Sequence, residues 1–182
     1  MHELEFVRPI QEVVSKVAKC KVKSYRQVTK RDLRGVSKII LSGTSLQDIK
    51  YLQHLEKFKA IAEESIKKKI PSLGICAGCQ VLGLLEGAKL ERLKKAEIGL
   101  VWIKLQKDFF NLKKGLMQVY CLHQSFLSWD KQLERKFEVI AYSKVKNKKV
   151  PQIIKHREKP WLGLLFHPEV RQKELIKKFV SL

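Results

Sequence analysis

Residues 73–80 read LGICAGCQ, and the segment around them indicates the fold class. "SLGIC" is a short apolar run typical of a buried strand, and "AGCQVLGLLEG" continues as a small-residue helix that ends at Gly87. Cys76 lies where the strand meets the helix. Three interpretations of this cysteine are open: a nucleophile on a sharp turn, half of a C-x-x-C redox pair with Cys79, or a small buried residue in a tight packing position.

The segment from Gly74 to Gly78 has the G-x-nucleophile-x-G pattern of a nucleophile elbow. A residue at such a strand-to-helix turn has a strained backbone, and the flanking glycines relieve the crowding around it. The N-terminus of the following helix directs free N–H groups and the positive end of its dipole at the site. This arrangement favours a thiolate and can stabilise an oxyanion.

Outward from this segment, helices and short apolar strands alternate in the first half of the chain, and strands dominate the second half. We expect helices at 3–18, 45–69, 77–87 and 171–182, and strands at 21–28, 36–43, 72–76, 97–105, 116–122, 137–143, 151–156 and 161–166. This order predicts one α/β domain spanning residues 1–182. Its sheet is expected to be open, mostly parallel and flavodoxin-like, with helices on both faces and an antiparallel extension.

The composition is that of a globular but strongly basic chain. The 182 residues include 38 Lys and Arg against 18 Asp and Glu, for a net charge of +20. A strongly positive electrostatic potential favours acidic partners. No aromatic residues interleave with the densest basic cluster, 144–150, so nucleic acid is not the expected main partner. The longest uncharged run, Ile70 to Leu85, is too short to span a bilayer, and the N-terminus has no signal-peptide pattern. We therefore expect a cytoplasmic protein.

The cysteines and histidines do not form a metal-binding pattern. Four cysteines in such a protein are expected to be free thiols. The five histidines have no zinc-site spacing with them, so we expect neither a metal nor a cofactor.

A nucleophilic cysteine needs a base, and "FHPEV" (166–170) supplies one. His167 and Glu169 are two residues apart, so on an extended backbone their side chains point the same way. Pro168 pushes His167 into the extended region and fixes its own φ. The Glu169 carboxylate can then accept a hydrogen bond from one imidazole nitrogen and leave the other for the thiol.

Together, "PSLGICAGCQ" and "IIKHREKPWLGLLFHPEV" resemble the two triad segments of the class I glutamine amidotransferases. The resemblance covers roughly residues 2–180. Within the family, "IKHREKP", the Val after His-Pro-Glu and "AEIG" (96–99) are most similar to the glutaminase subunit of GMP synthase.

The resemblance implies the roles of the site residues. Cys76 would attack the side-chain amide carbon of L-glutamine, His167 would carry the proton to the leaving ammonia, and Glu169 would orient His167. Gln80 would contact the substrate, and His123 in "CLHQSF" would support it. The oxyanion would be bound by the backbone N–H of Ala77 and by a donor from the turn "SGTS" (42–45), which contains Gly43 and Thr44. A separate ATP-dependent synthetase subunit would consume the ammonia.

Three departures from the family pattern stand out. The chain starts in what looks like the first helix, so the family's first strand is missing and a gap beside its neighbours is expected. Thr44 occupies the position of the second glycine of the oxyanion turn, where a β-branched residue fits poorly if φ must be positive. Leu165 replaces a frequent Gln, and "CLHQSF" matches the family's substrate-contacting segment only loosely.

Three other functions remain open from the sequence. One is a stand-alone γ-glutamyl hydrolase of the same fold, which the Thr44 departure supports. Another is a C-x-x-C thiol–disulfide protein that uses Cys76 and Cys79, although such a protein has no need of His-Pro-Glu. The last is a catalytically weak binding module that uses the basic surface.

Overall fold

The computed structural model describes residues 5–46 and 48–182. Its centre is one seven-stranded sheet in the order β1-β2-β7-β6-β5-β3-β4. The strands are β1 (Ile39–Leu41), β2 (Ser72–Ile75), β3 (Leu90–Leu105), β4 (Gly115–Leu127), β5 (Phe137–Val145), β6 (Lys148–His156) and β7 (Trp161–Leu164). The α-helices are α1 (Val7–Val14), α2 (Leu55–Lys67), α3 (Ala77–Leu85), α4 (Lys131–Lys136) and α5 (Lys173–Ser181), and two 3-10 helices, η1 (Lys30–Leu33) and η2 (Lys50–His54), precede α2.

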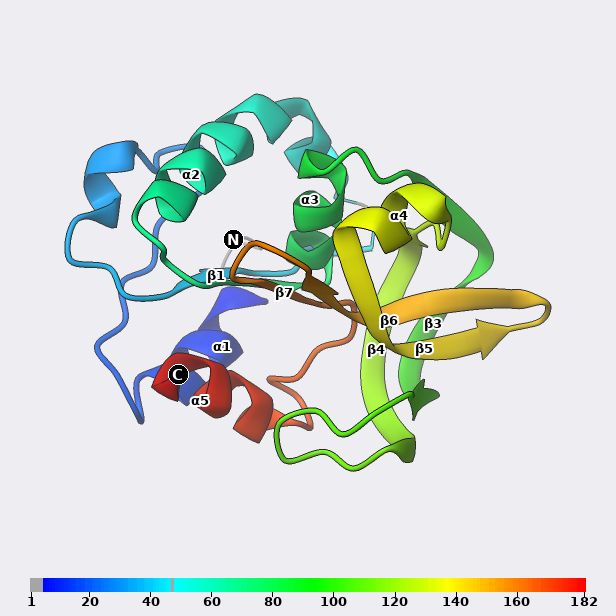
Figure 1. Ribbon diagram of the computed structural model, residues 1–182. Coiled ribbons are helices and arrows are strands. Elements are labelled where there is room, and N and C mark those ends of the chain that lie inside the picture. The colour runs from blue at the N-terminus through cyan, green and yellow to red at the C-terminus, as the bar shows by residue number, and fades with distance from the viewer. Residues whose placement is uncertain (1–4, 47) are drawn as a thin grey trace.

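The α/β class is confirmed, but the sheet is less parallel than expected. Among the described strands, β1–β2 and β2–β7 pair in parallel, whereas β7–β6, β6–β5, β5–β3 and β3–β4 are all antiparallel. The second half of the chain runs through hairpins, which join neighbouring strands in antiparallel directions. The strands there are also longer than the sequence pattern predicted, because β3 and β4 extend past their apolar runs. The antiparallel part curls away from the parallel part (Figure 1).

Helices cover both faces of the parallel part, as expected. In Figure 1, α2 and α3 lie on one side of β1 and β7, and α1 and α5 lie on the other. Apolar side chains of α1 and α5, among them Ile10 and Phe179, share one core cluster with Leu73 and Ile75 of β2. This packing explains why the short helix α1 is stable, since a helix of this length gains its stability from tertiary contacts. None of the helices in the described part of the chain is long and apolar enough to cross a membrane.

The N-terminal segment differs from the expectation. The helix predicted at 3–18 is α1, which is shorter, and residues 1–4 lie outside the described residues. The predicted strand at 21–28 is wrong, because that segment is irregular. It is held by side chains instead: the Tyr25 ring stacks on Phe58 of α2 with a centroid distance of 5.4 Å.

The edge of the sheet at β1 adjoins a cavity. In the described ranges, β1 pairs only with β2 and is the edge of the sheet. A cavity of about 390 Å³ lies along it, lined by Ile39 to Leu41, by the irregular segment around Val22 and Tyr25, and by Ala77 and Gly78 of α3. The cavity therefore reaches the helix that carries the nucleophile elbow.

Candidate active site

Cys76 lies on the strained turn that the sequence pattern predicts. It follows β2, is the N-cap of α3, and has φ 52° and ψ −108°. A positive φ is rare for a residue with a side chain, and such strain is typical of nucleophile elbows. The Cys76 N–H donates to the Leu164 carbonyl at 2.8 Å, which anchors the turn to β7. Its thiol is buried, and Sγ is 3.7 Å from the Leu122 carbonyl oxygen of β4.

The two glycines of the elbow are required by close backbone packing. A Cβ at Gly74 would lie 2.4 Å from the Gly78 carbonyl oxygen, and a Cβ at Gly78 would lie 2.1 Å from the Leu41 carbonyl oxygen. These contacts bring β1, β2 and the first turn of α3 together at one point. The spacing of glycines around Cys76 therefore has a direct structural cause.

His167 and Glu169 form the expected pair. The carboxylate oxygen Oε1 of Glu169 is 2.7 Å from Nδ1 of His167, and both side chains are buried. Burial alone would lower the pKa of His167, but the Cys76 thiol and the Glu169 carboxylate outweigh burial and raise this pKa to about 10. The Phe6 ring lies 5.6 Å from the imidazole, centroid to centroid. The His167 N–H of the main chain donates to the Tyr120 carbonyl of β4 at 2.8 Å.

Gly43 joins the turn at 42–45 to both reactive side chains. A Cβ built on Gly43 would lie 3.0 Å from Cε1 of His167 and 3.1 Å from Cβ of Cys76. The turn therefore packs directly against the Cys-His pair, and only glycine fits there without displacing one of them.

Thr44 has none of the strain considered from the sequence. It is not among the described residues with positive φ, and its hydroxyl donates to the Asp48 carbonyl at 3.1 Å. The β-branched side chain is thus compatible with this turn. Backbone strain at Thr44 therefore gives no reason to expect a defective oxyanion turn.

Ala77 and Gln80 lie on α3 close to Cys76 in the sequence. Ala77 is the first residue of the helix, where the N–H has no partner within the helix. The Gln80 carboxamide is bonded at both ends, because it accepts a hydrogen bond from the buried Tyr51 hydroxyl and donates to the Ser125 carbonyl at 2.9 Å. In this structure Gln80 braces α3 against η2 and β4.

Cys79 has the packing of a structural residue. It is a free thiol, as is Cys76, and burial raises its pKa. A Cβ at Gly163 of β7 would lie 2.6 Å from its Sγ, so the thiol occupies the space that this glycine leaves open. This packing favours the interpretation of Cys79 as a small residue beneath the elbow helix.

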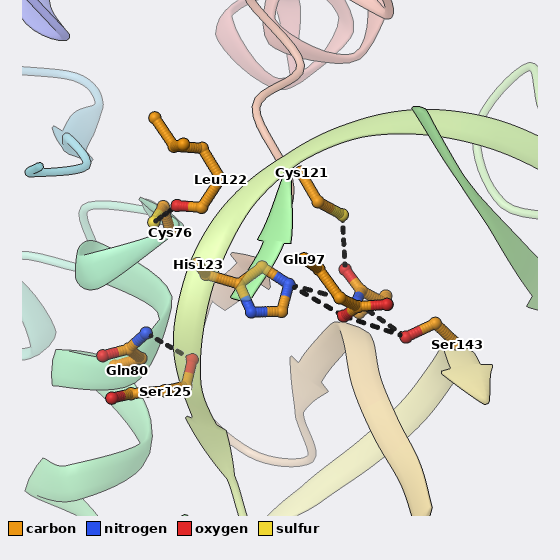
Figure 2. A network of polar contacts seen from close by, with 9 residues as sticks. Cys76, Gln80, Glu97, Cys121, Leu122, His123, Ser125 and Ser143 are labelled. Atoms are coloured by element: carbon orange, nitrogen blue, oxygen red, sulfur yellow. Dashed lines mark hydrogen bonds and ion pairs between the residues drawn. The ribbon is translucent and has the colours of Figure 1, made fainter. Parts of the chain in front are cut away.

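His123 lies on the far side of β4 from the nucleophile. Figure 2 shows Cys76 and Gln80 on one side of the strand, and His123 with Glu97, Cys121 and Ser143 on the other. Nε2 of His123 is 3.2 Å from a carboxylate oxygen of Glu97. That same oxygen accepts from Gln152 and from Ser143, each at 3.3 Å.

Glu97, Gln152 and Ser143 were not predicted from the sequence. Each is a polar residue at an inward position of an apolar strand, and this pattern could have marked them in the sequence. Their proximity could not be predicted, because it depends on the register of four strands. Glu97, Cys121 and His123 also place one possible metal-ligand atom each within 4.8 Å of the others. Gln152 Nε2 already contacts the Glu97 oxygen and, at 3.4 Å, the His123 nitrogen, so these side chains already form a hydrogen-bond network, in which Nδ1 of His123 is the only buried side-chain nitrogen or oxygen without a partner among the described residues.

Comparison with known proteins identifies the family. The model of the family described as glutamine amidotransferase class-I matches residues 6–181. The chain belongs to the class I glutamine amidotransferase family. The match covers the elbow, the His-Pro-Glu segment and the whole sheet, which confirms the resemblance expected from the two motifs.

The similar proteins agree with this assignment. The chain is 32% identical to a protein of Pyrococcus abyssi named as a glutamine-hydrolyzing GMP synthase subunit, over 164 residues that cover 80% of this chain and 85% of the relative. For the Methanocaldococcus jannaschii protein of the same name, the identity is 28% over 79% of this chain and 82% of the relative. Among solved structures, the glutaminase domain of Trypanosoma brucei CTPS, with bound acivicin, has a TM-score of 0.73 at 12% identity, covering 98% of this chain and 86% of that one. That structure shares the fold.

Proposed function

We propose that this amidotransferase is the glutaminase subunit of a GMP synthase, and that Cys76, His167 and Glu169 are its catalytic triad. The observation that carries the proposal is the geometry of the elbow. Cys76 has φ 52°, and Gly43 packs against both Cys76 and the His167 imidazole. A carboxylate oxygen of Glu169 lies 2.7 Å from Nδ1 of that imidazole. A nucleophile, a base and an orienting carboxylate are the three parts that covalent amide hydrolysis needs. The relatives named as GMP synthase subunits support the choice of acceptor.

In this mechanism His167 takes the proton of the Cys76 thiol, and the sulfur forms a bond to the side-chain amide carbon of glutamine. Negative charge develops on the amide oxygen and is bound by the Ala77 N–H and a donor from the turn at Gly43 and Thr44. His167 gives its proton to the departing nitrogen, the C–N bond breaks, and ammonia and a γ-glutamyl thioester result. Water, deprotonated by His167, then hydrolyses the thioester to glutamate and restores the thiol.

Glu169 keeps His167 productive throughout this cycle. Its bond to Nδ1 fixes the ring so that Nε2 is the nitrogen free for the thiol and the leaving group. Nε2 is buried and has no regular hydrogen bond among the described residues, and the nearby Cys76 thiol raises the pKa of His167. This nitrogen is therefore placed to exchange a proton with the thiol.

The acceptor is a separate ATP-dependent synthetase subunit in this proposal, and the assembly works in the cytoplasm without nucleic acid as a partner. The test is glutamine-dependent GMP formation when the chain is mixed with the synthetase subunit of the same organism. We expect glutamine to support GMP formation only in the presence of this chain, while added ammonium salt supports it with the synthetase alone. Ammonia release from glutamine without any transfer to the synthetase would reject the GMP synthase assignment and favour a stand-alone glutaminase.

A further inference from the structure

Large apolar side chains are exposed in a row on one face of the β3–β4 hairpin. Ile98, Leu100 and Trp102 occupy alternate positions of β3 and are 62%, 52% and 59% exposed, and Leu116 of β4 is 70% exposed. Side chains at alternate positions of a strand point to the same face, so the three β3 residues form one continuous row. Monomeric proteins rarely expose a contiguous apolar surface of this kind, and where they do it commonly marks an interaction site.

Most of the row lies on β3, which pairs with β4, and β4 is the strand that contacts Cys76 and His167. The register pairs Ile98 with Leu122, Leu100 with Tyr120 and Trp102 with Gln118. The carbonyls of those three β4 residues contact the catalytic region in turn: Leu122 lies 3.7 Å from Cys76 Sγ, Tyr120 accepts from the His167 N–H at 2.8 Å, and Gln118 accepts from the Gln172 side chain at 2.6 Å. β4 therefore lies between the row and these two residues, and a protein bound to the row would lie one strand away from Cys76 and His167.

The charges around the row are basic. The hairpin carries exposed lysines, of which Lys107 is paired with Glu138 and Lys113 with Asp108: Lys94, Lys95, Lys104, Lys107, Lys113 and Lys114. Its acidic groups are few and engaged: Asp108 binds Lys113 at 2.8 Å, Glu91 binds Lys148, and Glu97 points into the network with His123. A complementary partner therefore presents an apolar centre with acidic residues around it.

The chemistry of the site indicates what that partner does. Ammonia released into water near neutral pH takes up a proton and ceases to be a nucleophile, so the chain that consumes it must bind close to the site that makes it. The apolar row is an exposed surface one strand away from that site. We propose that the outer face of the β3–β4 hairpin, formed by Ile98, Leu100, Trp102 and Leu116, docks the ammonia-consuming synthetase subunit. This inference rests on the proposed function and adds the surface through which it operates.

The test compares the double variant Leu100→Glu/Trp102→Glu with Val17→Glu. Val17 is an exposed apolar residue, 46% accessible, in the segment after α1 and outside the hairpin. Binding of each chain to the purified synthetase subunit of the same organism's GMP synthase is measured by isothermal titration calorimetry. We expect the double variant to weaken binding at least tenfold and Val17→Glu to bind like wild type. Far-UV circular dichroism and melting temperature verify that each variant is folded.

The outcomes separate this inference from the function on which it rests. If wild type binds the synthetase and the folded double variant binds equally well, the docking face is wrong while the proposed function stands. If wild type neither binds the synthetase nor feeds it ammonia from glutamine, the proposed function fails and this face is no longer its docking site. Sedimentation showing a wild-type dimer that the double variant abolishes would assign the row to a second copy of the chain instead.

Discussion

At the scale of single residues, His167 is the group whose chemistry depends most on its surroundings. It is buried, which disfavours the imidazolium, yet a thiol and a carboxylate on either side raise its pKa to about 10. The folded structure therefore keeps a proton on His167 that an unfolded chain, with an ordinary histidine pKa near 6.5, would release.

This raised pKa predicts a pH dependence of stability. Because the folded pKa exceeds the unfolded one, the contribution of His167 is fully present below about pH 6.5 and is lost as the pH rises toward 10. We expect the difference in free energy of unfolding between wild type and His167→Gln to shrink over that range, measured by urea denaturation at a series of pH values. A difference that stays constant or grows with pH would contradict the raised pKa.

The members of the proposed triad could be picked out from the sequence because they carry local patterns. Cys76 has flanking glycines, and His167 and Glu169 are held two residues apart by a proline. Gln80 and His123 had no such local constraint, and the structure shows the carboxamide of one bonded to Tyr51 and Ser125 and the ring of the other turned toward Glu97. Contacts between distant strands decide such orientations, and these depend on a register that the sequence does not display.

At the scale of elements, the crossing of α3 over β1 and β2 sets the position of the nucleophile. Gly78 approaches the Leu41 carbonyl so closely that a methyl group has no space, and the opposing atom belongs to backbone that cannot rotate away. Farther along the same helix, Gly83 faces the methyl groups of the Leu127 side chain, which can change rotamer.

These two glycines provide a matched pair for a stability test. Gly78→Ala is expected to cost about 3 kcal/mol or more, since overpacking against a fixed backbone strains the fold. Gly83→Ala should cost clearly less, because the Leu127 side chain can shift and alanine gains about 1 kcal/mol of helix propensity over glycine. Chemical denaturation measures both, and equal losses of stability would show that backbone contact at Gly78 does not position the helix.

The element order was largely predictable, and its failures have physical causes. Strands β2 and β5 to β7 are apolar runs near their predicted positions. The segment 21–28 alternates as a strand does, but it lies against side chains such as Phe58 instead of pairing with the edge of β1. Alternation gives a strand only where another strand supplies hydrogen bonds, which explains this wrong prediction.

At the scale of the whole molecule, the buried network ties the antiparallel half of the sheet together behind the triad. Glu97 is on β3, His123 on β4, Ser143 on β5 and Gln152 on β6, and all four are bonded to one another through the Glu97 carboxylate or the Gln152 amide. The network fixes β4, the strand whose carbonyls contact both Cys76 and His167. The network therefore helps to hold Cys76 and His167 in place through β4.

Removal of the Glu97 carboxylate should therefore destabilise the protein. Glu97→Ala removes the carboxylate that pairs with His123 and accepts hydrogen bonds from Gln152 and Ser143, so buried polar groups lose a partner, and the expected loss is about 1–3 kcal/mol. Glu91→Ala on the same strand is the control, since Glu91 binds Lys148 and Ser128 near the surface, where an exposed ion pair contributes at most about 1 kcal/mol. If urea denaturation gives the same loss for both variants, the network does not stabilise the sheet as described.

The proposed mechanism depends above all on Cys76 as the nucleophile, and ammonia release from L-glutamine by wild type, Cys76→Ser and Cys79→Ser tests it most directly. The assay is run with the synthetase subunit present and absent, on variants shown to be folded. We predict that wild type releases ammonia, that Cys79→Ser retains most of this activity, and that Cys76→Ser falls by roughly 10⁴-fold or more, as loss of a triad nucleophile does. Equal loss in the two cysteine variants, or no ammonia from wild type under either condition, would contradict this mechanism.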